Sequence, residues 1–529
     1  MLNLTQDQLD LLLKAGVALS GEKNIDALME QIISVAMVIT NADGGSLYRK
    51  LDDDTLEFSI LKNNSLGLHM GGKSPNPSTI PPLPLYKNGQ EDHSRVVTHA
   101  VHTGNTIHVA DAYNADNFDF SGTRTTDERL GYRSQSFLTV PLRNHESEII
   151  GVLQLINAQD PITGKIVPFS QESQEIVEAL ASQAAVSLTN RLLINQLSHL
   201  FESFISLINH AIDDKSPYTG GHCERVPELT VMIADAVNRC RVGPLREFTM
   251  SEADRYELRI AGLLHDCGKI TTPVHVVDKA TKLQTIFDRI ALIDHRQAIV
   301  ARDLEIEALR GELSQEALTT RLNQLAADCQ FLRESNTGSE FMRPEAVQRV
   351  EAIANSYFWT NAQGDAQPFL SKEEVYNLTI RAGTLTAEER QIINHHIDVT
   401  IGMLERLPWP KHLQHVTEYA GGHHERMDGK GYPKGLTRDQ MSVQARCMAI
   451  ADVFEALTAA DRPYKPGKTL SEALNIMGKM KLDQHLDPDL FDIFIWEKVY
   501  ETYAQRFLKP EQIDKVDVTR IPGYNPPPS

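Results

Sequence analysis

The chain has 529 residues, which is too long for one hydrophobic core and predicts two or three domains. Its formal net charge of −19 provides no basic surface, so we expect neither a nucleic-acid polymer nor a membrane as partner. The five cysteines are scattered without a Cys-x-x-Cys motif, which is typical of reduced thiols. The first residues do not resemble a signal peptide, and no apolar run reaches the length of a membrane span. We therefore expect a cytoplasmic protein.

Residues 1–168 mix helix and strand patterns. Apolar residues at helical spacing cover residues 26–39. Strand patterns occur at residues 46–51, 56–61, 137–142 and 149–158. This mixture predicts an α+β domain in which helices flank an antiparallel sheet of four to six strands.

The second half of this domain resembles a GAF sensor domain. The resemblance rests on "FLTVPLRNHESEIIGVLQLINA" and on the following "FSQESQEIVEALASQAAVSL". GAF domains that bind cyclic nucleotides contain an Asn-Lys pair, whereas Asn117 is followed here by Phe118. The resemblance thus leaves the GAF ligand unknown, and a purely structural or dimerising domain is the alternative.

Residues 169–214 predict one long connecting helix, because no Gly or Pro occurs from Ser170 to Asp213. Ser170 is a suitable N-cap, and Glu172 in the first turn favours the helix dipole. A heptad seam with 3-4 spacing consists of Ile176, Ala179, Gln183, Val186, Asn190, Leu193, Leu197, Leu200, Phe204, Leu207 and Ala211. We expect this seam to form a parallel homodimer stalk; packing on the chain's own domains is the alternative.

Residues 215–515 predict an all-α domain. Helical patterns occur at 222–240, 252–266, 286–333, 345–356, 386–406, 442–459, 471–480 and 489–507. Residues 284–376 contain only one histidine and many i,i+4 charge pairs, so we interpret them as a helical-hairpin insertion without chemistry of its own. Residues 516–529 predict a loose C-terminal tail.

Histidines and acids in five separate segments of the all-α domain form a candidate metal site. The segments are "TGGHCERV" with His222, "LLHDCGK" with His265, Asp266 and Lys269, "INHHID" with His395 and His396, "GGHHER" with His423 and His424, and "AIADVFEAL" with Asp452. Side chains of this kind next to apolar helices need a charged partner, which a divalent cation provides. Nitrogen and oxygen donors without thiolates suit first-row metals such as Fe, Mn, Zn, Co or Ni.

The number of donors predicts two metal ions, because a single tetrahedral ion needs only three or four ligands. Asp266 is adjacent to His265 and is the best candidate for a bridging carboxylate. Two cations about 3.5–4 Å apart can hold a bridging hydroxide for in-line attack on phosphorus, which predicts phosphodiester hydrolysis. Lys269 is expected to neutralise a phosphate oxygen; a salt bridge to a nearby acid is its alternative role.

These motifs resemble those of the HD-GYP phosphodiesterases, a branch of the HD hydrolases. The matching segments are His-Asp-x-Gly-Lys at 265–269, His-His-Glu at 423–425 and Asp-Gly-x-Gly-Tyr-Pro at 428–433. The resemblance implies the metal ligands His222, His265, Asp266, His396, His423, His424 and Asp452. Family members with three metals carry a Glu where this chain has Tyr218, so two metals are expected rather than three.

The resemblance also implies a substrate, cyclic di-GMP, which the family hydrolyses to pGpG or to GMP. Arg462 and Lys465 resemble the phosphate-contacting pair of the family, with an ordinary surface loop as the alternative. The loop of Gly431, Tyr432 and Pro433 would approach the substrate, and the tyrosine ring could stack on guanine. Docking of a partner such as a diguanylate cyclase is the competing role of this loop. The rival functions are a non-catalytic cyclic di-GMP receptor and an HD hydrolase of other nucleotides.

Overall fold

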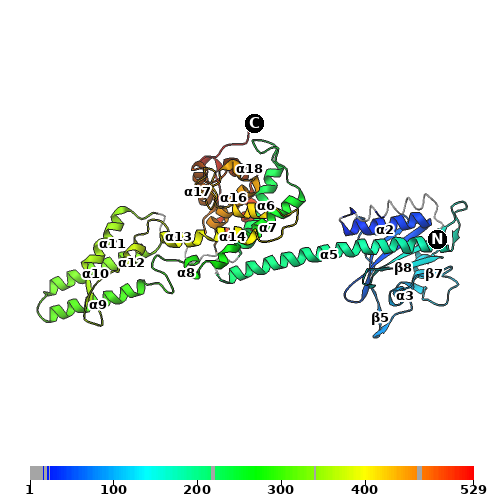
Figure 1. Cartoon of the computed structure of the whole chain (residues 1–529), viewed down its shortest axis with the longest axis horizontal. Coiled ribbons are helices and arrows are strands. Elements are labelled where there is room, and N and C mark those ends of the chain that lie inside the picture. Colours follow the sequence, from blue (N-terminus) through cyan, green and yellow to red (C-terminus); the bar gives the residue numbers. More distant parts are fainter. Residues whose placement is uncertain are drawn as a thin grey trace. The chain divides into compact units, whose positions relative to one another are not determined.

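The computed structural model describes residues 24–215, 221–338, 341–460 and 467–528, together with residues 16, 21 and 22. The chain divides into two compact units, Met1–Phe201 and Glu202–Ser529 (Figure 1). In the described parts of the chain, no helix is both long and apolar enough to cross a membrane.

The first unit contains an antiparallel sheet with the strand order β3-β2-β1-β9-β8-β7. These strands are β1 (Ala42–Lys50), β2 (Thr55–Asn63), β3 (Leu68–Gly71), β7 (Ile107–Val109), β8 (Phe137–Arg143) and β9 (Ile149–Gln159). The short β4 (Leu83–Pro84) pairs with β2, and β10 (Ile166–Val167) pairs with β9, so the sheet has eight strands. The predicted four to six strands were too few, because strands of two residues carry no alternation pattern.

One face of this sheet packs against two helices, α2 (Ile25–Thr40) and the first part of α5 (Gln171–Lys215). Asn24 caps α2 by accepting a hydrogen bond from the Ala27 amide. The hydrophobic core on this face combines Ile32 of α2, Leu155 of β9 and Leu180 of α5, all essentially fully buried. The other elements among the described residues of this unit are a hairpin of β5 (Tyr86–Lys87) and β6 (Gln90–Glu91), α3 (Val96–Thr103) and α4 (Ser121–Leu130).

Helix α5 presents two different apolar faces. The face that contains Val177, Leu180 and Leu188 is buried in the core of the first unit, and Ile176 from the predicted seam is buried with it. The later apolar members of the seam are 45–64% exposed; they are Leu193, Leu197, Leu200, Phe204 and Leu207. These members of the seam are therefore substantially exposed in the described chain.

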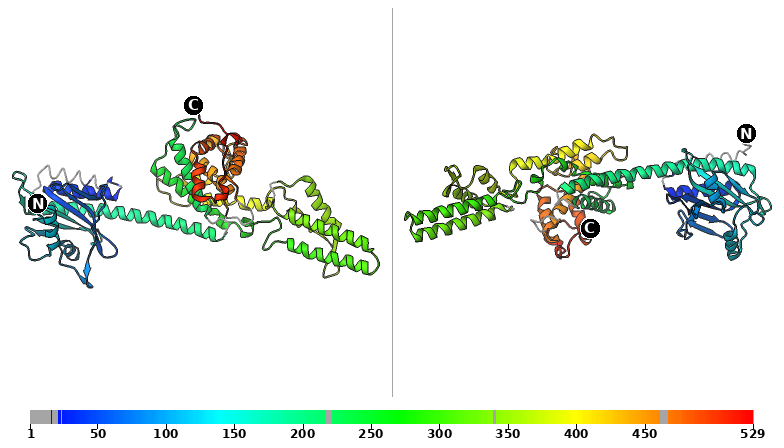
Figure 2. Two further views of the ribbon diagram at one scale, coloured as in Figure 1. Left: turned by 180° about the vertical axis from the view of Figure 1, so that it is seen from behind. Right: turned by 90° about the horizontal axis from the view of Figure 1, so that it is seen from below.

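The second unit is helical, as predicted (Figure 2). Its central helices are α6 (His222–Arg239), α7 (Glu252–Leu264), α8 (Val274–Val277), α13 (Ala387–Asn394), α14 (His396–Leu404), α15 (Val416–Gly421), α16 (Val443–Thr458), α17 (Leu470–Leu482), α18 (Pro488–Trp496) and α19 (Val499–Phe507). Two predicted helices each prove to be two. The 386–406 pattern breaks at His395, and the 489–507 pattern breaks at Lys498, whose φ of 52° no α-helix can continue.

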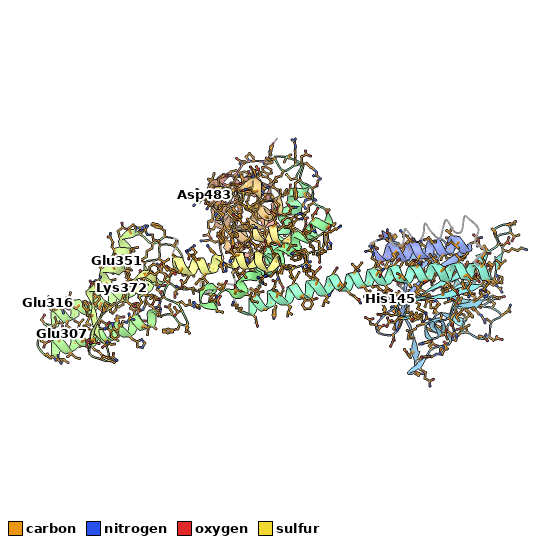
Figure 3. All side chains as sticks on the ribbon, in the orientation of Figure 1. His145, Glu307, Glu316, Glu351, Lys372 and Asp483 are labelled. Carbon is orange, nitrogen blue, oxygen red and sulfur yellow. The ribbon has the colours of Figure 1, made fainter. Side chains whose placement is uncertain are left out.

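The predicted insertion has a hydrophobic core of its own. It consists of α9 (Ile290–Leu309), α10 (Gln315–Asn336), α11 (Pro344–Ser356), α12 (Lys372–Leu378) and a hairpin of β11 (Phe358–Thr360) and β12 (Ala366–Pro368). Helices α9 and α10 lie side by side, with Glu307 and Glu316 near their outer ends (Figure 3). Where the chain enters and leaves the predicted insertion, Lys279 Nζ lies 2.7 Å from Glu389 Oε2 and 3.0 Å from Asn377 Oδ1.

Candidate metal centre

Three of the predicted histidines lie at helix ends, where the last backbone carbonyls lack helical partners. His265 follows α7, His396 follows α13 and His423 follows α15. In each case Nδ1 contacts the carbonyl oxygen of the residue three positions earlier, at distances of 2.6, 2.5 and 2.6 Å respectively. The helix end thus holds the imidazole by Nδ1–H and leaves Nε2 as the free coordinating atom.

His222 is held in the same way by a carboxylate that the sequence did not single out. Its Nδ1 lies 2.5 Å from Glu455 Oε2, and Glu455 is itself held by Arg225 at 2.6 Å. Glu455 follows Asp452 by three residues on α16, so both acids lie on the same side of the helix. This i,i+3 spacing was the one pattern in the sequence that could have indicated a role for Glu455. A carboxylate on the outer nitrogen of a histidine orients it and makes it a better metal ligand.

The free Nε2 atoms converge on Asp266, which is buried. Asp266 Oδ2 lies 3.3 Å from both His222 Nε2 and His265 Nε2, and its Oδ1 lies 3.2 Å from His396 Nε2. Two groups of three donors have their ligand atoms within 4.8 Å of one another and could hold a metal ion; one is His222, His265 and Asp266, and the other is His396, His423 and His424. The two oxygens of Asp266 thus lie next to histidines of both groups.

The residues fit a metal centre for an electrostatic reason. A neutral imidazole that donates through Nδ1 presents a lone pair at Nε2, and a carboxylate oxygen also presents lone pairs. These atoms cannot hydrogen-bond to each other, and the buried His423 Nε2 and Asp266 Oδ1 have no hydrogen-bond partner. Burying polar atoms without partners costs free energy. Cations between these atoms would accept the lone pairs of both the imidazole nitrogens and the carboxylate oxygens.

The electrostatics of the histidines differ across the centre. Burial lowers the pKa of His423 to about 4, and His265 beside it adds to this effect. Burial also opposes the charge of His222, but its hydrogen bonds to Asp266 and Glu455 raise its pKa to about 9. The carboxylates of Asp266 and Glu455 thus favour positive charge at this end of the centre.

Lys269 lies one turn after Asp266 in the short 3-10 helix η1 (Cys267–Thr271). Its Nζ forms an ion pair with Asp266 Oδ2. Burial would raise the pKa of Asp266, but Lys269 and His265 hold it well below its usual range. The salt bridge considered from the sequence is thus present, and it places the ammonium group directly at the centre.

The turn between His265 and Lys269 depends on a glycine. A Cβ atom on Gly268 would lie 2.0 Å from the carbonyl oxygen of His396. The Gly268 amide also donates a 2.9 Å hydrogen bond to Thr400 Oγ1 on α14. Close contact of these two backbones brings Asp266 and His396 together.

The Gly-Tyr-Pro loop folds back onto the His-His-Glu segment. Glu425 is buried, and its carboxylate accepts hydrogen bonds of 2.8 Å from the amides of Lys434 and Leu436. A Cβ atom on Gly431 would lie 2.4 Å from Glu425 Cα, so only glycine allows this approach. The Tyr432 ring stacks on His424 with centroids 4.8 Å apart, and His424 Nε2 lies 3.3 Å from His396 Nε2. Pro433 follows Tyr432 through a cis peptide bond.

The structure brings most of the predicted site residues together. Asp452 Oδ1 lies 3.4 Å from His222 Nε2, at the edge of the cluster. The His395 side chain is exposed, and its Nδ1 lies 3.0 Å from Asp398 Oδ2. Arg462, Lys465 and Tyr218 lie outside the described residues.

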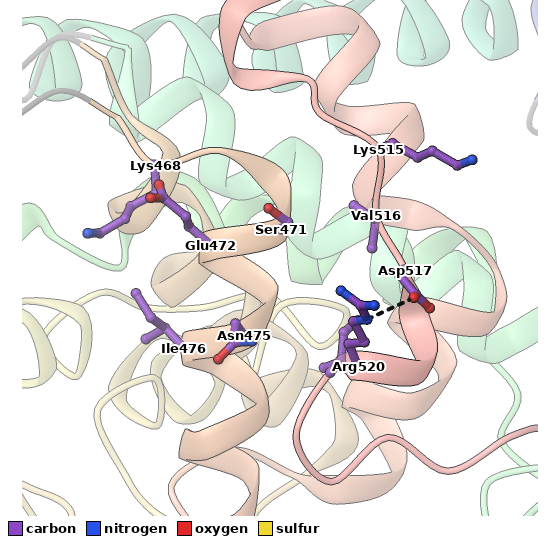
Figure 4. A pocket seen from close by; sticks show the side chains of 10 residues that line it. Lys468, Ser471, Glu472, Asn475, Ile476, Lys515, Val516, Asp517 and Arg520 are labelled. Carbon is purple, nitrogen blue, oxygen red and sulfur yellow. Dashed lines mark ion pairs between the residues drawn. The ribbon is translucent and has the colours of Figure 1, made fainter.

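A surface cavity of about 520 Å³ lies elsewhere in the second unit. Its lining includes Lys468, Glu472 and Lys515, and Arg520 pairs with Asp517 at its wall at 3.3 Å (Figure 4). None of the candidate metal ligands lines it, so we assign it no part in the metal chemistry.

Comparison with known families agrees with both parts of this description. A GAF domain model matches residues 24–188, and two HD domain models match residues 219–327 and 372–490. The chain combines a GAF domain with an HD domain. The GAF and HD resemblances seen in the sequence are confirmed, and the interval between the two HD matches lies within the α9–α12 insertion.

Similar proteins of Vibrio cholerae are named as cyclic dinucleotide phosphodiesterases. The 3'3'-cGAMP-specific phosphodiesterase 1 is 48% identical over 80 residues, which cover 15% of this chain and 18% of the relative. The 3'3'-cGAMP-specific phosphodiesterase 3 is 25% identical over 319 residues, covering 60% and 42%. A probable cyclic di-GMP phosphodiesterase is 31% identical over 234 residues, covering 39% and 51%. The chain thus spans about half or less of the length of these relatives.

We expect Gly268→Ala to reduce the metal content of the HD domain, because the new methyl group would push α14 and its His396 away from Asp266. Gly402→Ala is the matched control, since Gly402 lies in α14 and a Cβ there meets nothing within 4 Å. Elemental analysis of both purified variants measures the difference. Full metal content in Gly268→Ala would contradict the proposed role of this contact.

We expect Glu455→Gln to weaken metal binding by about 10–100-fold, because it removes the charged partner of His222 Nδ1. The side chain keeps its shape, so packing is preserved. Competition with a chelator measures the affinity, and the exposed Glu405→Gln serves as control. Equal affinities in both variants would show that Glu455 does not act through His222.

Proposed function

We propose that the chain is a metal-dependent phosphodiesterase that hydrolyses cyclic di-GMP to pGpG, to GMP or to both, under regulation by its GAF domain. The observation that carries this proposal is the convergence of imidazoles from four segments on the buried Asp266. The names of the relatives support the reaction class.

The proposed cofactor is a pair of divalent first-row cations such as Fe or Mn, and a third ion is not expected. One group of ligands is His222, His265 and Asp266, and the other is His396, His423 and His424, with Asp452 at the edge. When bound, such ions activate water and stabilise the charge that develops in an in-line displacement at phosphorus.

The protein's own residues would orient the substrate around this centre. Lys269 already lies against Asp266 and can exchange part of that ion pair for a nonbridging phosphate oxygen. The loop with Gly431, Tyr432 and Pro433 is anchored by Glu425 beside His424, which favours contact with a nucleotide over the metals. One face of Tyr432 lies on His424, so a guanine base would stack on the opposite face. Arg462 and Lys465 remain proposed phosphate contacts.

A second candidate substrate is 3'3'-cGAMP, which differs from cyclic di-GMP in one base. The observation that favours it is the 48% identity over 80 residues to a relative named for this substrate. Both substrates contain the same two phosphodiester bonds, so the metal centre serves either one. The choice between them depends on contacts with the second base.

Asp266→Asn should lower kcat/KM for both dinucleotides by more than about 100-fold, because it removes the carboxylate charge shared by the two ligand groups. Chromatography of the products of purified protein reconstituted with Fe or Mn measures the rates and separates pGpG from GMP. Asp398→Asn is the control, because its exposed carboxylate pairs with His395 at 3.0 Å and belongs to neither ligand group. Binding of dinucleotide without turnover under either metal would favour the non-catalytic receptor.

We propose that α5 forms a homodimer stalk in a cytoplasmic protein. The support is the exposed row of Leu193, Leu197, Leu200 and Phe204, whose 3-4 spacing matches the seam of a two-stranded coiled coil. The GAF domain could then act on the HD domain through this helix. The Gly-Tyr-Pro loop is also the proposed docking surface if a diguanylate cyclase binds.

The double variant Leu197→Glu/Phe204→Glu should convert the dimer to a monomer, because it places like charges opposite each other at two seam positions. Sedimentation velocity measures the molecular mass. Asn195→Glu is the control, since Asn195 lies on the opposite side of the same helix. A wild-type chain that sediments as a monomer would refute the stalk without affecting the proposed reaction.

A further inference from the structure

The GAF domain contains a second cluster of imidazoles that has no part in the HD site. It consists of Glu91 on β6, His93 in the following loop, and His99 and His102 one turn apart on α3. Glu91 and His93 are exposed, whereas the His102 side chain is only 6% exposed. Ions from solvent can therefore reach Glu91 and His93, whereas the buried His102 side chain is held in place by its surroundings.

The ring nitrogens of two of these histidines face each other. His93 Nδ1 lies 3.1 Å from His99 Nδ1. Among the described residues, imidazole nitrogens of two histidines contact each other otherwise only at His222–His265 and His396–His424, both at 3.3 Å in the metal centre. Two Zn–N bonds of about 2.0–2.1 Å at a tetrahedral angle separate their nitrogens by about 3.3 Å. The spacing of His93 and His99 is thus close to that of two ligands of one ion.

Hydrogen bonds on the outer nitrogens select the coordinating atoms. His93 Nε2 lies 3.1 Å from Glu91 Oε2, which accepts its proton and leaves Nδ1 with a lone pair toward His99. His102 Nε2 donates to the Leu85 carbonyl oxygen at 2.8 Å, which likewise leaves its Nδ1 as an acceptor. That Nδ1 lies 3.8 Å from Glu91 Oε1, the second oxygen of the carboxylate that contacts His93. The carboxylate behind His93 and the carbonyl behind His102 match the arrangement found around metal-binding histidines.

The third histidine lies at a suitable distance from the pair. The ring centroids of His93 and His102 are 5.2 Å apart, and those of His93 and His99 are 5.0 Å apart. In the metal centre, the His222–His265 and His396–His424 centroids are 5.3 and 5.1 Å apart. Unlike in the metal centre, three ligand atoms of this cluster do not all lie within 4.8 Å of one another, so binding one ion requires the side chains to rotate. In the absence of an ion, the Nδ1–H group of His99 can donate a hydrogen bond to Nδ1 of His93.

We propose that the GAF domain binds one divalent transition-metal ion through His93, His99 and His102, with Glu91 positioning His93. Imidazole nitrogens without thiolates favour Zn²⁺, Ni²⁺ or Cu²⁺ over Mg²⁺ or Ca²⁺. Exposed Glu91 and His93 leave room for water to complete the coordination. The site would give the GAF domain a metal input that is separate from the catalytic ions.

Zinc stoichiometry of the full chain tests the site. After removal of metals and dialysis against Zn²⁺, His93→Gln/His99→Gln should contain one zinc equivalent fewer per chain than the wild type. His69→Gln is the matched control, because His69 pairs with Glu30 in the same domain and has no second imidazole beside it. Equal zinc content in the double variant and the control would overturn the proposal.

Hydrogen–deuterium exchange of the wild-type chain gives a second test that needs no variant. Addition of Zn²⁺ should slow exchange in peptides that cover residues 85–103, and Mg²⁺ should not. Peptides around His265 and His423 report the HD site separately, so a change confined to them would refute the GAF site while leaving the phosphodiesterase proposal intact.

Discussion

The arrangement of the HD domain depends on one repeated hydrogen bond, in which the outer nitrogen of a buried histidine donates to a fixed oxygen. Three of these oxygens are backbone carbonyls at helix ends, and the fourth belongs to Glu455. Each bond settles the tautomer and orientation of its ring, so four Nε2 atoms are directed to the inside before any ligand binds. Asp266 lies among them, and its negative charge is stabilised by Lys269. Such a concentration of acceptor atoms is unfavourable by itself and becomes favourable with cations.

The backbone around this centre is as constrained as the side chains. Gly268 brings the Asp266 turn into contact with α14, and Gly431 brings the Gly-Tyr-Pro loop into contact with Glu425. The buried Glu425 holds the loop through two backbone amides rather than through a metal. The third residue of the His-His-Glu segment therefore fixes the wall of the site, while the first two belong to a group that could hold a metal ion. This division explains why an acid adjacent to two ligand histidines lies outside the metal cluster.

Helix α5 combines two roles that need different faces. Val177 and Leu188 complete the core of the GAF domain, whereas Leu197 and Phe204 remain exposed at heptad spacing. In the proposed dimer stalk, a change in how the GAF core holds the first part of the helix would alter its rotation or register along the coiled coil. The imidazole cluster of Glu91, His93, His99 and His102 lies in the same GAF unit, so occupation of that cluster is one event that could bias α5.

The sequence by itself determined the elements and the chemical class of the site, because both depend on local patterns. Hydrophobic periodicity located the main strands and α5, and five short segments supplied nearly all of the histidines and acids that meet at Asp266. The two-residue strands β4 and β10, the breaks at His395 and Lys498, and the role of Glu455 were decided by tertiary structure. Strand pairing and hydrogen bonds between α6 and α16 join residues more than a hundred positions apart, and no local pattern records such a contact. The same reason applies to the GAF histidines, whose common orientation depends on the carbonyl of Leu85 and on the carboxylate of Glu91.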